Sequence, residues 1–203
     1  MNLKSIFKGY QNIAGVDEVG RGSLIGPVYA SAVILKKNCD VKKLKDSKKL
    51  TKKEREVLNK YIKKNSYWSI GSASKEEIEK LNILNASLLA MKRAIKKLKK
   101  KPRLVLVDGN RIPVMKNYNL KYVIKGDQKI PQISAASIVL KFLGTVWWKK
   151  YQRIFQNING IKIVDMEQKF IFKQFENLVS QSIIEELSSL YTIYWVQDNN
   201  RHN

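Results

Sequence analysis

Three carboxylates in the sequence could hold a divalent metal ion. Asp17 and Glu18 directly follow the apolar run 13–16, and Asp108 directly follows the continuously apolar run 104–107. If these runs are neighbouring parallel strands, their carboxyl ends meet at one edge of a sheet, where the three side chains converge. Clustered carboxylates repel one another unless a cation neutralises them, and oxygen ligands without histidine or cysteine favour Mg²⁺ or Mn²⁺. On a basic protein, such a site indicates phosphoryl-transfer chemistry.

Three short polar segments could contact a phosphate-bearing ligand. Residues 20–22 (GRG) join two expected strands, and glycines there let backbone N–H groups approach a ligand closely. Residues 46–50 (DSKKL) lead into a helix start, where anions bind well, and residues 125–127 (KGD) follow another expected strand. Taken singly, each segment is more typical of an ordinary turn or helix cap. The spacing of the three carboxylates is equally compatible with solvated turn residues.

The amino-acid composition indicates the class of binding partner and the cellular compartment of the protein. The chain has 203 residues, with 39 Lys and Arg against 17 Asp and Glu, which gives a net charge of +22. Such an excess suggests a polyanionic partner, usually nucleic acid, and the alternative is a lysine-rich surface without a specific partner. The single cysteine, Cys39, excludes a disulfide framework and fits a reducing cytosol, so we expect a cytoplasmic protein. The single histidine, His202, makes histidine catalysis and histidine-ligated zinc implausible.

No apolar run approaches the roughly 18–20 residues that a membrane-spanning helix needs, so we expect no membrane partner.

Hydrophobic periodicity and turn signals predict the elements that must position these residues. Thr51 and Glu54 match a helix capping box, Pro102 ends a helical pattern, and the glycines at 20–22 are compatible with a hairpin. This order indicates an α/β domain with a mixed central sheet flanked by helices. The expected strands are 13–16, 27–35, 67–71, 104–107 and 121–124, and the expected helices are 51–62, 74–81, 85–99 and 134–141. The aromatic residues expected in the core rather than as base-stacking platforms are Tyr29, Tyr61, Trp68 and Tyr122.

Five motifs occur in an order that resembles the ribonuclease HII family, a type 2 ribonuclease H. They are AGVDEVGRG at 14–22 with GPV at 26–28, DSKKL at 46–50, VDGN at 107–110, KGD at 125–127 and AASI at 135–138. The resemblance covers about residues 10–141. It implies an RNase H-like fold and an endonuclease that cuts the RNA strand of RNA–DNA hybrids, including single ribonucleotides embedded in DNA. It also implies that cleavage leaves 3′-hydroxyl and 5′-phosphate ends and that the protein has a role in ribonucleotide excision repair. We expect a monomer.

The resemblance assigns the three carboxylates a common role. Asp17, Glu18 and Asp108 match three of the four catalytic carboxylates that bind Mn²⁺ or Mg²⁺ in the family.

The resemblance also assigns roles in substrate binding. Gly20, Arg21 and Gly22 match the loop that recognises the ribose 2′-hydroxyl, the group that distinguishes RNA from DNA. Lys48 matches a residue of the family's D-S-K motif that contacts phosphate.

The resemblance ends at about Lys141. The family continues with A-K-V and R-D-R, whose Asp is the fourth metal ligand, and later with K-G-Y-G-T and histidines. The in-frame sequence after Lys141 has no counterpart of this Asp or of the Y-G-T segment. The charge changes at the same place, since residues 1–141 carry +21 and residues 142–203 carry +1. Two functions follow as alternatives: a ribonuclease H, or a catalytically impaired basic protein that binds nucleic acid without the fourth carboxylate.

We predict that residues 1–141 form an RNase H-like catalytic core and that residues 142–203 are an aberrant tail. In a shifted reading frame, each codon consists of the third base of one original codon and the first two bases of the next. From about Val139 onward, the residues that this frame allows include sequence typical of the family. Residues 139–146 permit A-K-V-L-R-D-R, in which the codons of Gly144 and Thr145 give the missing Asp. The tail is then a frameshifted family tail, and the alternative is a divergent natural one. Resequencing the gene tests this, because the shifted frame must lack early stop codons and must contain Y-G-T.

Overall fold

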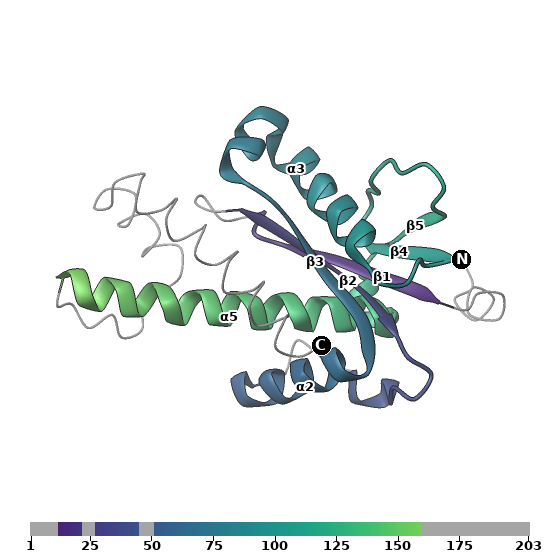
Figure 1. Cartoon of the computed structure of the whole chain (residues 1–203), viewed down its shortest axis with the longest axis horizontal. Coiled ribbons are helices and arrows are strands. Elements are labelled where there is room, and N and C mark those ends of the chain that lie inside the picture. The colour runs from purple at the N-terminus through teal and green to yellow at the C-terminus, as the bar shows by residue number, and fades with distance from the viewer. Residues whose placement is uncertain (1–11, 22–26, 45–50, 160–203) are drawn as a thin grey trace. The chain divides into compact units, whose positions relative to one another are not determined.

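The computed structural model describes residues 12–21, 27–44 and 51–159, with side chains described through residue 145. The elements are β1 (Ile13–Val19), β2 (Val28–Leu35), the 3-10 helix η1 (Val41–Leu44), α2 (Lys52–Lys64), β3 (Ser66–Ala73), α3 (Lys75–Lys97), β4 (Leu104–Asp108), β5 (Leu120–Val123), α4 (Gly126–Lys129) and α5 (Pro131–Asn159). The strands form one sheet in the order β3-β2-β1-β4-β5 (Figure 1). The pairs β1–β2 and β2–β3 are antiparallel, whereas β1–β4 and β4–β5 are parallel. The expected mixed sheet flanked by helices is confirmed.

Alternation along the strands gives the sheet two apolar faces. Ala14 and Val16 of β1 are fully buried in a cluster that contains the alanines of α3. Ile13 of β1 and Leu104 and Leu106 of β4 belong to a second cluster, together with Ile133 near the start of α5. The two helices therefore cover opposite faces of the sheet (Figure 1).

Both helices lie directly on the strands where glycine replaces a side chain. A Cβ built on Gly15 of β1 would overlap the backbone of Gln132 in α5. A Cβ built on Gly71 of β3 would overlap the backbone of Ala90 in α3. Because backbone cannot yield as a flexible side chain does, these two positions require glycine.

The local signals in the sequence predicted the helix starts well. The capping box of α2 is present, with Thr51 and Glu54 bonded reciprocally. The two helices expected over 74–81 and 85–99 are continuous in α3 except at Asn82, whose φ of 66° and ψ of 163° break the helical path. The Asn82 Oδ1 accepts a hydrogen bond of 3.0 Å from the Asn85 N–H, so it caps the second part of the helix.

Helix α5 is much longer than the helix expected over 134–141, since it begins at Pro131 and continues to Asn159. The expected boundary at residue 141 thus falls inside a helix. The described residues from 27 to 159 belong to one compact unit. Because the side chains beyond residue 145 are outside the description, the aberrant tail stays a prediction. Within the described part of the chain, no helix combines the length and apolar character needed to cross a membrane.

Candidate active site

Asp17 and Asp108 lie side by side where the parallel pairing of β1 and β4 ends, toward the carboxyl ends of the two strands. Val16 of β1 is the register partner of Val107 of β4, and each aspartate is the next residue along its strand. Neighbouring strands are separated by about 4.8 Å. Since side chains alternate between faces, Asp17 shares the α5 face with Ile13, and Asp108 shares it with Leu106. The parallel pair on which the metal-site prediction depended is therefore present.

The surroundings of Asp17 disfavour a negative charge. The pKa of the Asp17 carboxyl is raised from 3.8 to about 7, mainly because the group is buried and also because Glu18 and Asp108 are negatively charged nearby. Two hydrogen bonds oppose this effect, one from the Ser137 hydroxyl and one of 2.8 Å from the Glu18 N–H. Like charges held this close favour a bound cation, and their oxygen atoms are the donors that Mg²⁺ and Mn²⁺ prefer.

A buried hydroxyl beside Asp17 has no protein partner among the described residues. Ser31 of β2 is the register partner of Asp17, so both side chains lie on the α5 face. Ser31 is fully buried, and its Oγ makes no hydrogen bond to the described part of the chain. A buried polar atom without a partner is costly, so this edge of the sheet fits a hydrated ligand better than a sealed core.

Asp108 is held in place by the glycine of the KGD motif. The Gly126 N–H donates a hydrogen bond of 2.6 Å to the Asp108 Oδ1. A Cβ at Gly126 would lie 3.2 Å from that oxygen and 2.5 Å from the Cδ1 of Ile133, so a larger residue would crowd the contact. Lys125, which precedes it, adopts the left-handed conformation with a φ of 55°. The sequence indicated either an ordinary turn or a phosphate contact at 125–127; in the structure this turn orients a carboxylate.

Glu18 is placed differently from the two aspartates. Its Oε1 accepts a hydrogen bond of 3.1 Å from the Arg21 Nη1, in an ion pair across the turn that leaves β1. In the ranges that the structure describes, no group of three or more Asp, Glu, His or Cys side chains is close enough to hold a metal ion. The structure therefore brings Asp17 and Asp108 together, and Glu18 contributes its charge nearby while its carboxylate pairs with Arg21.

The expected substrate-binding residues are described only in part. Gly20 has a φ of 102°, a conformation that favours glycine, and a Cβ there would lie 3.0 Å from the Pro27 carbonyl oxygen. The Arg21 side chain is 47% exposed, so its guanidinium is accessible from solvent at the carboxyl end of β1. Gly22 and Lys48 lie outside the described residues.

Ser137 is a candidate site residue that reasoning from the sequence did not single out. It belongs to the AASI motif at 135–138, and its buried hydroxyl bonds to Asp17. A possible signal was the small residue repeated along this stretch, Ala135, Ala136 and Ser137, because only small side chains let a helix lie this close to a strand.

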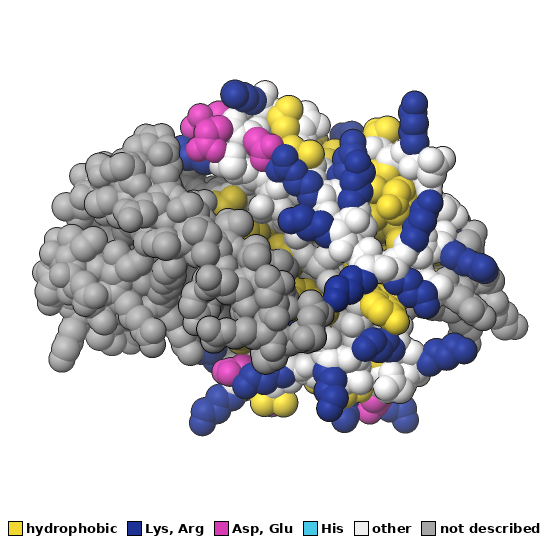
Figure 2. Space-filling view, viewed as in Figure 1, with side chains coloured by type: hydrophobic (Ala, Val, Ile, Leu, Met, Phe, Trp, Pro, Cys, Tyr) yellow, Lys and Arg dark blue, Asp and Glu magenta, His cyan; other side chains and the backbone are white. Residues whose placement is uncertain are grey.

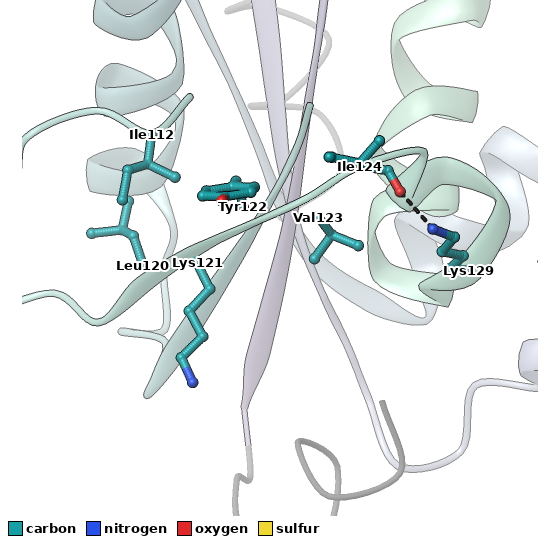
Figure 3. Close-up of a pocket in the computed structure, with 7 residues that line it drawn as sticks. All are labelled: Ile112, Leu120, Lys121, Tyr122, Val123, Ile124 and Lys129. Atoms are coloured by element: carbon teal, nitrogen blue, oxygen red, sulfur yellow. Dashed lines mark hydrogen bonds between the residues drawn. The ribbon is translucent and has the colours of Figure 1, made fainter. Parts of the chain in front are cut away.

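A pocket of about 600 Å³ lies along the edge strand β5 (Figure 3). Its walls are mainly apolar, and the Lys129 Nζ donates a hydrogen bond of 2.8 Å to the Ile124 carbonyl at one side. Tyr122 is 52% exposed here, so the expectation that it belongs to the core is wrong; β5 is the last strand of the sheet and its side chains reach the surface. The lining residues are Ile112, Leu120, Lys121, Tyr122, Val123, Ile124 and Lys129, and none of the three carboxylates is among them.

Comparison with known proteins identifies close relatives. Residues 14–160 match the sequence model of a family described as Ribonuclease HII. The chain is 68% identical to the ribonuclease HII of Pelagibacter ubique over 145 residues, which are 71% of this chain and 78% of that protein. The matches to ribonuclease HII proteins from Vibrio parahaemolyticus, Neisseria meningitidis and Vibrio vulnificus span 64% to 66% of their lengths, which is less than two thirds.

Solved structures share the fold at low identity. The ribonuclease HII in a PCNA complex from Archaeoglobus fulgidus has a TM-score of 0.68 and 24% identity, and the match covers 83% of this chain and 90% of that one. A Bst ribonuclease HIII solved in complex with Mn²⁺ has a TM-score of 0.59 and 14% identity, with 92% of this chain and 67% of that one covered. These similarities show the RNase H-like fold.

Proposed function

The chain belongs to the ribonuclease HII family, and from that premise we propose that it cuts the RNA strand of RNA–DNA hybrids and cuts DNA at embedded ribonucleotides. The observation that carries the proposal is the adjacency of Asp17 and Asp108 at the end of a parallel strand pair. Their mutual repulsion and the raised pKa of Asp17 are typical of a site built to bind a cation.

We propose Mn²⁺ or Mg²⁺ as the cofactor, held by Asp17 and Asp108, with Glu18 as a third ligand when it leaves Arg21. When bound, the cation supplies a water nucleophile and stabilises the leaving oxygen. The Ser137 hydroxyl orients the Asp17 carboxylate, and the Gly126 N–H orients the Asp108 carboxylate, each through a hydrogen bond. In the overall reaction, water adds to phosphorus and the P–O3′ bond breaks, which leaves a 3′-hydroxyl and a 5′-phosphate.

We propose that the loop after β1 recognises the substrate. Gly20 and Gly22 would let the backbone approach the ribose 2′-hydroxyl, Arg21 would bind phosphate, and Lys48 would make a further phosphate contact. The proposal draws support from the positive φ of Gly20 and from the exposed side chain of Arg21.

We further propose that the protein acts as a monomer in the cytoplasm in ribonucleotide excision repair. The buried, free thiol of Cys39 is compatible with a reducing compartment.

A catalytically impaired binder is the second candidate, because the fourth carboxylate of the family has no in-frame counterpart. Thr145, where the shifted codons give Asp, lies on α5 two turns after Ser137 and bonds through its hydroxyl to the Lys141 carbonyl at 3.0 Å. The variant Thr145→Asp therefore offers a way to restore a carboxylate on the same helix. A gain in cleavage by this variant would indicate that the natural chain is impaired.

The test is a cleavage assay on a DNA duplex with one embedded ribonucleotide, with Mn²⁺, with Mg²⁺ and with a chelator. We expect metal-dependent cleavage beside the ribonucleotide and a loss of at least about 1000-fold in Asp108→Asn, since a metal site contributes several kcal/mol to the barrier. The matched control Asp40→Asn removes an exposed carboxylate elsewhere and should keep full activity. Salt-sensitive binding of the duplex without cleavage would contradict the proposed ribonuclease activity and support the catalytically impaired nucleic-acid-binding protein.

A further inference from the structure

The amino ends of β1 and β4 lie at the end of the sheet opposite the carboxylates, and three other segments meet there. The Lys36 N–H, after β2, donates a hydrogen bond of 3.0 Å to the Asn65 carbonyl, before β3. The Lys36 Nζ donates one of 3.1 Å to the Lys64 carbonyl at the end of α2. The Arg103 N–H, before β4, donates one of 3.1 Å to the Asn12 carbonyl, before β1. The first two bonds join the end of β2 to the segment between α2 and β3, and the third joins the starts of β1 and β4. The two groups are neighbours because β1 and β2 pair between them, with Ala14 opposite Ile34.

The surface at this end of the sheet is basic and lacks acidic residues over long stretches of the chain. No Asp or Glu occurs in residues 57–75 or 80–107, and the nearest one after β2 is Asp40. Figure 2 shows Lys and Arg side chains scattered densely over the visible described face, with few acidic side chains. We define the basic end surface as the exposed or half-exposed residues Lys36, Lys37, Lys63, Lys64, Lys96, Lys97, Lys99, Lys100, Lys101 and Arg103.

Aromatic rings hold several of these lysines in place. The ammonium groups of Lys36 and Lys100 both lie over the Tyr67 ring, 5.5 Å and 5.6 Å from its centre. The Lys63 ammonium lies 4.5 Å from the centre of the Trp68 ring. Such contacts restrict long side chains that would otherwise be mobile, so less entropy is lost when they bind a ligand.

Helix stabilisation accounts for only part of this charge. Lys63 and Lys64 lie in the last turn of α2, and Lys96 and Lys97 lie in the last turn of α3, where cations interact favourably with the helix dipole. The other six residues lie outside helices, so the dipoles do not explain them. Positive charges from stretches of sequence that contain no Asp or Glu match the regularly spaced phosphates of a nucleic acid duplex.

We propose that the basic end surface binds the phosphate backbone of a second duplex segment, without sequence preference, while the carboxylate edge holds the segment to be cut. The two sites are separated along β1, in which the chain advances four residues from Ile13 to Asp17, or about 13 Å. The second segment is a distant part of the same nucleic acid or another molecule. The proposal goes beyond the proposed cleavage function and depends only on binding.

The test counts the duplexes bound per chain, with the full chain, a short DNA duplex without ribonucleotides, a chelator and low salt. The variant Lys97→Gln/Lys100→Gln/Lys101→Gln removes three charges from the basic end surface. The control Lys53→Gln/Lys80→Gln/Lys116→Gln removes three exposed charges elsewhere. We expect two duplexes per wild-type chain and per control chain, and one per surface variant. Any residual binding of a second duplex to the surface variant should have a salt slope smaller by about 2 to 3, at about 0.9 per lost phosphate contact.

Three outcomes would overturn the proposal. One is a single duplex per wild-type chain, and another is equal loss of the second duplex in the surface variant and the control. The third is binding to vesicles with anionic lipid, lost in the surface variant, without a second duplex, which would assign the surface to membranes. Cleavage by a chain that binds one duplex would refute this proposal alone, whereas two duplexes without cleavage would refute the proposed function alone.

Discussion

The two ends of the strand pair β1 and β4 carry charges of opposite sign and different burial. At their carboxyl ends, Asp17 and Asp108 are partly buried, are close together and are held by individual hydrogen bonds. At their amino ends, the basic end surface spreads ten exposed or half-exposed cations over several segments. Buried charges are costly, and each depends on its few neighbours, whereas exposed charges cost little and act together through their sum. Single substitutions should therefore have large effects at the carboxylate edge and small effects at the basic end.

The largest expected effect on stability is that of Asp17→Asn. The pKa of Asp17 in the folded protein, about 7, lies above its unfolded value of 3.8, so the ionised carboxylate destabilises the metal-free fold. Its favourable contribution is complete below about pH 4 and is lost as the pH rises through 7. Removing the charge should raise the free energy of unfolding at pH 8 by roughly 2–4 kcal/mol.

Urea unfolding with a chelator at pH 5 and pH 8 measures this change. The wild type should lose stability between the two values, and the variant should lose less. At pH 8, added Mn²⁺ should stabilise the wild type and leave the variant unchanged, because only the former keeps both carboxylates. A variant less stable than the wild type at pH 8 would show that Asp17 is not under electrostatic strain.

A smaller effect is expected from Ser137→Ala. The Ser137 hydroxyl lowers the pKa of Asp17, so its loss should raise that pKa further and make a proton compete better with the metal. We expect Mn²⁺ affinity at pH 7 to fall roughly tenfold, as is typical when a residue supporting a metal ligand is removed. Titration calorimetry at pH 7 and pH 8.5 should show the deficit narrowing at the higher pH.

Ser134→Ala provides the matched control. Ser134 is on the same helix and equally buried, but its hydroxyl donates a hydrogen bond of 2.7 Å to the Leu44 carbonyl, away from the carboxylates. It should reduce stability without changing the affinity for Mn²⁺. Equal losses of affinity in both variants would mean that Ser137 acts only through packing of α5.

The smallest effect is expected at the basic end. The variant Lys97→Gln/Lys100→Gln/Lys101→Gln should change the free energy of unfolding by less than about 1 kcal/mol, because these side chains are exposed and only two contact an aromatic ring. Thermal unfolding at fixed pH and salt measures it. A larger loss would make these lysines structural and would erase the contrast between the two ends of the sheet.

The sequence was informative where one local pattern sufficed. The continuously apolar run at 104–107 predicted a strand buried on both faces, and all four of its residues are fully buried. The position of Asp108 at the end of β4 follows from the same pattern, whereas Asp17 lies inside β1, which continues to Val19 in its pairing with β2 beyond the expected end at residue 16. The break at Asn82 was also visible, as a gap between two helical patterns.

Contacts between distant segments could not be read from the sequence. The hydrogen bond from Gly126 to Asp108 joins residues from two different elements, and the bond from Ser137 to Asp17 crosses from α5 to β1. The exposure of Tyr122 depends on β5 being the outermost strand, which is a property of sheet order rather than of local pattern. The roles of the KGD and AASI motifs thus became clear only when the chain was folded.

The absence of a side chain at Gly15 has a consequence for motion. Since α5 lies against the backbone of β1 there, the helix cannot slide along the strand or rotate without colliding with it. The helix and strand should therefore open only together, as one cooperative unit in hydrogen exchange. Amides of β1 and of the first turns of α5 should exchange at a common rate near that of global unfolding. The backbones that carry Ser137 and Asp17 should then separate only when this unit unfolds.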